Sequence, residues 1–294
     1  MNNRNLLNLG LLIFIVIVAA IAIYDSEDDS LTKNPITSLT KDDIDTIIIK
    51  RKDKVEIHLK KQHNQWRLTQ PYNTATNQFR MDTLLRLVET VPHSTYSLED
   101  TSAYGLNDPK LEVHFNLGKN NAETIKFGDS EPIKLRRYVS VGNKLHITND
   151  TYFYALTSVA TDYISHKLLP TDFKIKKLEL PKLKLEIKDE RWKVTPEQEN
   201  FSIDNVNELI NEWNTAQSID IKPYKGKINI SNKNTIKLYG EDASTFTFNI
   251  LKDDKEFILV DTLIGLQYSF PLDKKIQLLN LPAPVVNEED ALSE

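Results

Sequence analysis

Cysteine is absent from the 294-residue chain. This absence excludes disulfide bonds, thiol nucleophiles, thiolate zinc sites and a lipid-modified N-terminal cysteine. It leaves the cellular compartment open, because secreted and cytosolic proteins can both lack cysteine. A chain of 294 residues is long enough for one large domain or two modest domains with a substantial core.

The sequence also lacks the short motifs that mark common active sites. It contains no G-x-G-x-x-G, no phosphate-binding loop, no H-E-x-x-H and no G-x-S-x-G. The six histidines are scattered, and only His114 and His146 lie on predicted strands that could bring them together as a metal pair. Such histidines are more often ordinary strand positions, so we predict no metal site, no cofactor and no enzymatic activity.

No concentrated basic region is present. The net charge is −5, but residues 25–29 carry four negative charges, residues 288–294 carry four more, and Arg4 carries one positive charge. Setting these charges aside leaves +2 for residues 30–287. A nucleic-acid-binding protein would concentrate positive charge on its body, so we predict no nucleic-acid partner.

What the sequence does contain is one long apolar run, LLNLGLLIFIVIVAAIAIY, over residues 6–24. A helix of this length spans roughly 28 Å, close to the thickness of a hydrocarbon core. We therefore predict a transmembrane helix at residues 6–24. Two alternatives are a secretory signal peptide, cleaved near the Ala20-Ile21-Ala22 stretch, and a buried helix of a soluble protein.

The flanks of the apolar run predict its orientation. Arg4 precedes the run and an acidic cluster follows it. Because positive residues stay on the cytoplasmic side, residues 1–5 are expected in the cytoplasm and the body outside the cytoplasmic (inner) membrane, in the periplasm. Residues 25–40 are polar and without period, as expected of a tether. The acidic tail at residues 283–294 is predicted to be disordered.

One short sequence motif occurs twice in the chain. NQWRLTQP begins at Asn64 and ERWKVTPE begins at Glu190, and each reads as a strand that carries a tryptophan and ends at a proline. A five-point apolar helix face with the same spacing follows each motif: Met81, Leu84, Leu87, Val88 and Val91 in the first, and Ile203, Val206, Leu209, Ile210 and Trp213 in the second. At the same offset, Phe79 matches Phe201 and Asp82 matches Asp204; Ser202 is a candidate N-cap.

Strand-like runs surround both helices. The runs lie at residues 45–50, 54–59, 111–117, 124–127, 137–141, 145–148, 235–239, 245–250, 256–260 and 266–270. We therefore predict an α+β fold with two related β-β-α-β-β-β-β units and mainly antiparallel sheets. The first unit covers residues 41–170 and closes with a helix at 151–169 capped by Asp150, and the second covers residues 171–282.

The stretch FGDSEPIKLRRYV, residues 127–139, is the first candidate binding site. It places Asp129 near Arg136 and Arg137 across a short loop. Guanidinium groups bind carboxylates and phosphates well, so the two arginines are candidate partner-binding residues. In the alternative interpretation, these charges satisfy one another across a hairpin.

A run of lysines at the start of the second unit is the second candidate. Its members are Lys174, Lys176 and Lys177, followed by Lys182 and Lys184. Such a run can meet anionic lipid headgroups or an acidic protein partner. The alternative is a strand edge that lysines protect from aggregation.

Several short sequence motifs together resemble those of a known family. They are NRNLLNLGLLIFIVIVA, WRLTQP, FRMDTLLRLV, YGLNDPKLEV, FGDSEP, RRYVSV and the LLP at residues 168–170. The chain resembles the bacterial domain-of-unknown-function family 4340 over most of its length, most strongly from the apolar run through Pro170. The resemblance implies a single-pass envelope protein, and members are often encoded near ABC-type permeases and gliding-motility-like transport proteins. It implies no catalytic residues.

We consider three functions. The first is a non-enzymatic accessory or scaffolding component of an envelope complex, for example of an ABC-type transporter, with protein partners. The second is an envelope module that binds lipid or glycan, which would need an apolar or aromatic pocket between the units. The third, a carboxylate-based hydrolase, would need two acidic residues that converge in a cleft. The sequence specifies no small-molecule ligand.

The predicted orientation has a direct test. If the body lies outside the cytoplasmic membrane, protease added to intact spheroplasts digests it, because no membrane then shields residues 41–282. A body that stays protected until the spheroplasts are lysed would show that the predicted orientation is wrong.

Overall fold

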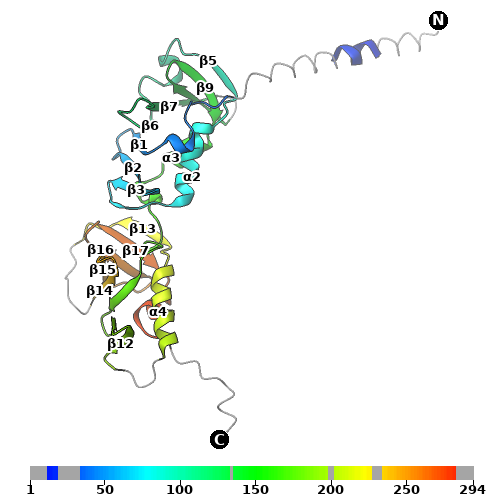
Figure 1. Ribbon diagram of the computed structural model, residues 1–294. Coiled ribbons are helices and arrows are strands. Elements are labelled where there is room, and N and C mark those ends of the chain that lie inside the picture. The colour runs from blue at the N-terminus through cyan, green and yellow to red at the C-terminus, as the bar shows by residue number, and fades with distance from the viewer. Residues whose placement is uncertain (1–11, 19–33, 133–134, 198–201, 227–233, 283–294) are drawn as a thin grey trace.

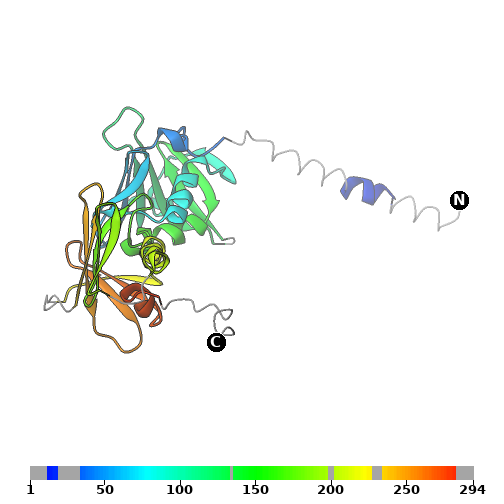
Figure 2. The same cartoon turned by 60° about the horizontal axis from the view of Figure 1, so that its bottom comes forward.

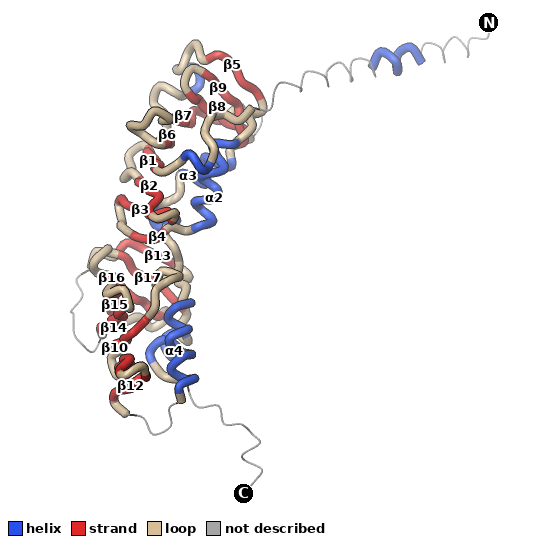
Figure 3. The backbone as a smooth tube through the Cα atoms, in the orientation of Figure 1, coloured by secondary structure: helices blue, strands red, loops and turns tan. Residues whose placement is uncertain are grey.

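The structure is a computed structural model that describes residues 12–18, 34–132, 135–197, 202–226 and 234–282. It confirms the predicted α+β class, with two mainly antiparallel sheets that form the two lobes of an elongated body (Figure 1). The tube in Figure 3 places one sheet in each lobe, with the helices gathered along one side of both.

The first sheet has nine strands in the order β4-β3-β2-β1-β6-β7-β8-β9-β5. Their bounds are β1 (Thr46–Arg51), β2 (Ile57–Gln62), β3 (Gln65–Gln70), β4 (Thr74–Ala75), β5 (Ser94–Ser97), β6 (Leu111–Phe115), β7 (Glu123–Ser130), β8 (Arg136–Val141) and β9 (Lys144–Asn149). Helix α2 (Gln78–Arg86) continues into a 3₁₀ turn, Leu87–Glu89, and α3 (Thr151–Leu156) contacts α2. Two further 3₁₀ turns lie at Lys41–Asp43 and Ser102–Tyr104.

The second sheet has eight strands in the order β12-β11-β10-β14-β15-β16-β17-β13. Their bounds are β10 (Ile175–Glu179), β11 (Lys184–Lys188), β12 (Arg191–Thr195), β13 (Asp220–Pro223), β14 (Thr235–Gly240), β15 (Thr245–Leu251), β16 (Phe257–Asp261) and β17 (Leu266–Phe270). Helix α4 (Ile203–Thr215) packs against α5 (Lys274–Leu279), and the view in Figure 2 looks down α4.

Both sheets follow one strand order once the two-residue β4 is set aside. In each, three consecutive strands lie at one end, the strand after the helix forms the opposite edge, and the last four strands fill the middle. The hairpin turns also agree: His63 and Asn64 between β2 and β3, and Asp189 and Glu190 between β11 and β12, all have positive φ. Two positive φ values in a two-residue loop match the twist of a type I′ hairpin.

Apart from β4, each unit has three strands before its long helix and five after it, whereas the predicted β-β-α-β-β-β-β pattern has two and four. The strand missed after the helix is β5 in the first unit and β13 in the second. Both are edge strands with mostly polar, exposed residues, so neither carries a run of buried side chains that would reveal it. In each unit the missed strand pairs with the last strand of the sheet.

The apolar faces of the two helices are buried, but the predicted alignment between them is shifted. Val91 and Ile203, at opposite ends of the predicted faces, are 49% and 54% exposed. The N-caps are Asn77 and Ser202, each accepting a hydrogen bond from a backbone N–H of the first turn. Aligned on these caps, the contacts of α2 with the core correspond to those of α4. They are Met81, Leu84, Leu85 and Val88 in the first unit, and Val206, Leu209, Ile210 and Trp213 in the second.

The predicted closing helix at 151–169 is wrong in extent. Helix α3 ends at Leu156, a 3₁₀ turn follows at Ala160–Tyr163, and the chain then becomes extended. Asp150 precedes α3 but makes no capping hydrogen bond with its side chain. Its carboxylate is instead bound by the side chain of Arg137.

The segment predicted as a tether is only partly described, and its described end packs on the first unit. Ile36 and Leu39 are buried, and the Ile36 amide donates to the Thr90 carbonyl oxygen at 2.9 Å. The rest of the tether, residues 25–33, and the tail at 283–294 lie outside the described residues.

The predicted transmembrane run is also mostly outside the described residues. Residues 12–18, its middle part, are helical with exposed side chains, whereas 6–11 and 19–24 are not described. Within the described ranges, no helix is long and apolar enough to cross a membrane.

Trp213 anchors α4 in the second unit. Its side chain is fully buried, its ring stacks on Phe248, and its Nε1–H donates to the Leu278 carbonyl oxygen at 3.0 Å. We expect Trp213→Ala to lower the free energy of unfolding by about 3–5 kcal/mol, because it leaves a large cavity. Half-buried Trp192 is the control, and Trp192→Ala should cost clearly less. Urea unfolding followed by circular dichroism measures both, and equal losses would contradict this account.

Candidate functional site: a groove between the two units

One extended segment, residues 163–168, pairs with both units. On the first unit, the Asn77 amide donates to the Tyr163 carbonyl oxygen at 2.8 Å, and Thr76 and Ile164 form an antiparallel bridge. On the second unit, Lys167 and Gln217 form a second bridge. This connecting segment therefore fastens the β4 edge of the first sheet to the chain that enters β13.

His166 strengthens the second half of this connection. The Ser218 amide donates to the His166 carbonyl oxygen at 2.9 Å, and the imidazole Nδ1 lies 2.7 Å from the Ser218 carbonyl oxygen. A carbonyl oxygen can only accept, so Nδ1 carries the proton of this hydrogen bond. The imidazole is thereby held in a fixed orientation beside the groove.

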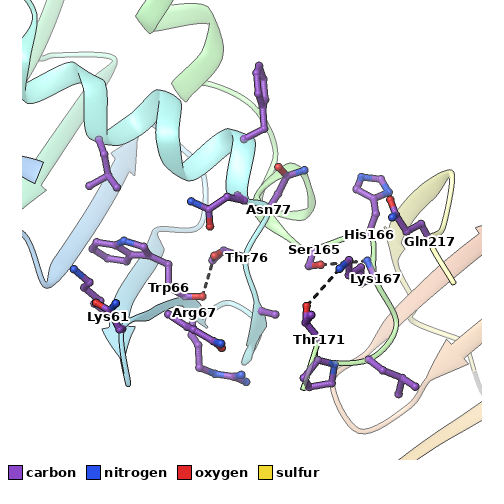
Figure 4. A pocket seen from close by; sticks show the side chains of 18 of the residues that line it. Lys61, Trp66, Arg67, Thr76, Asn77, Ser165, His166, Lys167, Thr171 and Gln217 are labelled. Carbon is purple, nitrogen blue, oxygen red and sulfur yellow. Dashed lines mark hydrogen bonds between the residues drawn. The ribbon is translucent and has the colours of Figure 1, made fainter. Parts of the chain in front are cut away.

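An open groove of about 780 Å³ lies along the connecting segment. Its walls come from β2, β3, the start of α2, the connecting segment and residues 217–218 of the second unit. Figure 4 shows Lys61, Trp66 and Arg67 on one side, and His166, Lys167 and Gln217 on the other. Most of the lining thus comes from the first unit with its connecting segment, and Thr171, Gln217 and Ser218 of the second unit complete it.

The groove carries unpaired positive charge. Lys61, Arg67 and Lys167 line it, and within the described ranges none of the three forms an ion pair. Arg67 donates to the Asn73 side chain at 3.3 Å, and Lys167 approaches the Thr171 hydroxyl at 3.4 Å, which are neutral partners. The carboxylate in the lining is that of exposed Asp42.

Two aromatic rings share this groove. Trp66 is half-buried and shares a sheet face with the buried Leu68, so the indole lies beneath α2 (Figure 4). Phe79, on the first turn of α2, is 75% exposed, although a ring of this size is usually buried. Trp66 packs against the core, and part of its surface remains accessible to solvent.

A second cavity, of about 400 Å³, is lined by Lys167 and Leu168 of the connecting segment and by residues of both sheets. Arg67 and Lys167 line both cavities. Asp261 lines the second, and burial raises the pKa of its carboxyl, an effect opposed by hydrogen bonds from the Ile264 and Leu263 amides. The two cationic side chains thus stand at the boundary between the two cavities.

Arg137, a predicted partner-binding residue, has a structural role instead. Its side chain is 6% exposed and forms a two-pronged ion pair with Asp150, with Nε–Oδ1 at 2.5 Å and Nη2–Oδ2 at 3.3 Å. It also donates to the Gly128 carbonyl oxygen and to Ser130, and its guanidinium lies over the Phe153 ring. All three nitrogens of Arg137 donate hydrogen bonds inside the protein and its side chain is 6% exposed, so Arg137 is not positioned to bind an external anion.

The other two charges of that candidate site also differ from expectation. Asp129 lies 3.9 Å from Lys110 in an exposed contact, rather than against an arginine across the hairpin. Arg136 is half-buried and forms no ion pair with any residue in the described ranges. The motifs around Arg137 that carry the family resemblance meet here. The Tyr104 and Tyr138 rings lie in tilted contact, with centroids 4.9 Å apart, and a Cβ at Gly128 would collide with the Tyr104 carbonyl oxygen.

The lysine run lies on the second sheet, far from β8 of the first sheet (Figure 3). Lys177 pairs with Glu179 at 2.7 Å and lies over the Tyr239 ring, whereas Lys174 and Lys176 are exposed. The alternative interpretation, in which these lysines protect an edge strand from aggregation, is wrong, because β10 lies inside the sheet between β11 and β14. The structure does not bring the two predicted sites together.

The two candidate metal histidines are on opposite faces of the first sheet. Residues that pair across neighbouring strands lie on the same face of the sheet. Leu111 pairs with Phe127, Phe127 pairs with Val139, and Val139 pairs with His146, so His146 lies on the same face as Leu111. His114, three residues from Leu111, points to the other face. Burial lowers the pKa of both imidazoles. The described part of the chain contains no cluster of three potential metal-ligating side chains.

Sequence reasoning missed the groove. The sequence marks Trp66 only as the tryptophan of a predicted strand, and no pattern singles out Lys61, Arg67, His166 or Lys167. The only sequence signal was the Trp-Arg pair at residues 66–67, because consecutive strand residues face opposite sides and can serve two cavities. The groove itself depends on the junction of the two units, which no local pattern encodes.

The fold and the groove together define an α+β protein of two antiparallel sheets with a cationic, aromatic groove between them. Within that class, the family model described as Domain of unknown function (DUF4340) matches residues 66–243, more than half of the chain. The chain belongs to this family, as the sequence resemblance predicted. Neither curated proteins nor solved structures yielded a match.

The buried Arg137–Asp150 pair provides a stability test with a built-in control. We expect Arg137→Met to lower the free energy of unfolding by about 3–5 kcal/mol, because it leaves the Asp150 carboxylate buried without its partner. The neighbouring Arg136→Met should cost about 0.5 kcal/mol or less, since Arg136 has no such pair. Urea unfolding compares the two, and equal effects would show that Arg137 has no special structural role.

Proposed function

We propose that this protein is a non-enzymatic, membrane-anchored component of the cell envelope that binds a ligand in the groove between its two units. The observation that carries the proposal is the set of cations in the groove, Lys61, Arg67 and Lys167, which find no carboxylate partner in the described protein. Charged side chains gathered without counter-charges around accessible aromatic rings favour binding. A carboxylate-based hydrolase would instead need two acidic groups converging there.

The membrane anchor is part of this proposal. The apolar run at residues 6–24 is long enough to span a bilayer, and Arg4 favours a cytoplasmic N-terminus. The helical residues 12–18 support it, since apolar side chains such as those of Phe14 and Val16 are about 60% exposed, as a lipid-facing helix requires. The body would then lie in the periplasm.

We also propose that the two units are copies of one repeat. The common strand order and the paired type I′ turns support this. Equivalent buried positions at equal distances from the helix N-caps support it as well. In a repeat of this kind the groove arises where one copy meets the next.

An accessory or scaffolding role in an envelope complex, for example that of an ABC-type transporter, is compatible with ligand binding. It would use a second surface, for which Lys174 and Lys176 are suitable because both are exposed and unpaired among the described residues. Exposed lysines of this kind suit an acidic protein partner.

Site-specific photo-crosslinking in cells tests the binding role. The photoreactive residue p-benzoylphenylalanine replaces Phe79 in the groove, or Tyr96 on the distal strand β5 as the control. We expect a discrete adduct from position 79 that is absent from position 96, because only the groove holds a ligand. Identical patterns from both positions would contradict a binding role for the groove. Mass spectrometry of the adducts also shows whether a permease is present.

A further inference from the structure

The electrostatics of the groove restrict the class of its ligand. Lys61 and Arg67 come from neighbouring strands of the first unit, and Lys167 comes from the connecting segment. Elsewhere, lysines on the two sheets lie near carboxylates, as in Lys50–Glu56 at 3.6 Å and Lys184–Glu186 at 2.9 Å. The groove therefore presents positive charge that the protein leaves uncompensated, and an anionic ligand complements it.

The aromatic side chains add a second requirement. The indole of Trp66 and the ring of Phe79 provide accessible flat faces within the same groove. Flat aromatic faces bind apolar ring surfaces at low entropic cost. A ligand that fits both features has rings with an apolar face and carries negative charge.

Neutral polar side chains complete the lining. Asn64, Gln65 and Gln217 are exposed and lie on both sides of the groove. Each amide offers two donors and an acceptor, which suits the hydroxyl groups of a sugar. Hydroxyl-rich rings, unlike fatty acyl chains, need this mixture of aromatic and amide contacts.

An extended acidic peptide is less suited to this groove. Peptides that bind beside a sheet usually add a strand to a free backbone edge. Here the β4 edge is already occupied, because the Ser165 amide donates to the Ala75 carbonyl oxygen at 2.9 Å and Thr76 is bridged to Ile164. Recognition must therefore come from side chains, as in saccharide binding.

Resting on the binding role proposed above, we infer that the groove binds an acidic saccharide, a sugar chain that carries carboxylate or phosphate groups. Trp66 stacks on a sugar ring, while Lys61, Arg67 and Lys167 pair with the acidic groups. The side-chain amides of Asn64, Gln65 and Gln217 donate hydrogen bonds to sugar hydroxyl groups and accept hydrogen bonds from them. These residues are binding residues, and no chemical step is involved.

Isothermal titration calorimetry on the full-length protein in detergent tests this inference. The probes are hexagalacturonate, phosphorylated maltohexaose, neutral maltohexaose and hexaglutamate. We expect binding of at least one of the two acidic saccharides, much weaker binding of maltohexaose and none of hexaglutamate. Binding should weaken at about 1 M salt, where the screening length falls to about 3 Å. The two acidic probes distinguish carboxylate from phosphate recognition.

Matched variants locate the binding. Trp66→Ala should weaken affinity for the acidic saccharide by about tenfold or more, and Trp192→Ala, at the corresponding strand position of the second unit, should leave it unchanged. Because Trp66 also packs against the core, Lys167→Glu provides a second variant at an exposed side chain outside the core, with the exposed Lys176→Glu as its control. Equal effects of each variant and its control would overturn the assignment.

The outcomes separate this inference from the broader proposal. Binding of hexaglutamate or of neutral maltohexaose that depends on Trp66 would overturn the acidic-saccharide class while leaving a binding groove. Failure of both acidic saccharides to bind would overturn the inference outright. A groove-specific adduct at position 79 would then still support a binding role, and its absence would remove both.

Discussion

The pairing of one extended segment with both units is the constraint on which the rest of the body depends. Residues 163–165 pair with the edge of the first sheet, and 166–168 pair with the chain that enters β13. The three residues before the 165–166 peptide bond thus pair through main-chain hydrogen bonds with the first unit, and the three residues after it pair in the same way with the second unit. Main-chain pairing fixes register more strictly than side-chain packing, because a shift by one residue reverses every side chain. The imidazole of His166, bound to the Ser218 carbonyl oxygen, adds a side-chain hydrogen bond to the same connection.

This constraint has two consequences for recognition. It occupies the backbone edge beside β4, so a ligand in the proposed site would be contacted by side chains rather than added as a strand. It also places Lys167 opposite Lys61 and Arg67, which gathers cations that would otherwise be separate surface residues. Arg137 of the first unit differs from the groove cations, because it is buried and forms an ion pair with Asp150 inside the protein. The same residue type therefore stabilises the fold where it is paired and is available for binding where it is not.

Much of the fold could be predicted from the sequence, and the errors have physical causes. Alternating apolar residues predict most of the strands. The predicted runs do not include β10 and β11, although both lie inside the second sheet, and they omit β5 and β13 because edge strands with exposed side chains show no such pattern. The two helix faces were recognised, yet aligned three residues out of step, since a period of 3.6 residues makes shifts of three or four nearly equivalent. Asp150 had the right residue type for a helix cap, but its buried arginine partner lay 13 positions away in the sequence. The groove could not be predicted, because its walls come from segments that meet only at the junction of the units.

The central claim is that the connecting segment holds the two units in one arrangement, so that the groove is already formed before a ligand binds. The absence of cysteine makes a direct measurement possible, since two introduced cysteines are the only sites for spin labels. Arg86→Cys on α2 and Asn211→Cys on α4 place labels on exposed positions of the two units. Double electron–electron resonance should give a single narrow distance distribution for the labelled protein without ligand. A broad or multi-peaked distribution would show that the units move independently and would contradict a preformed groove.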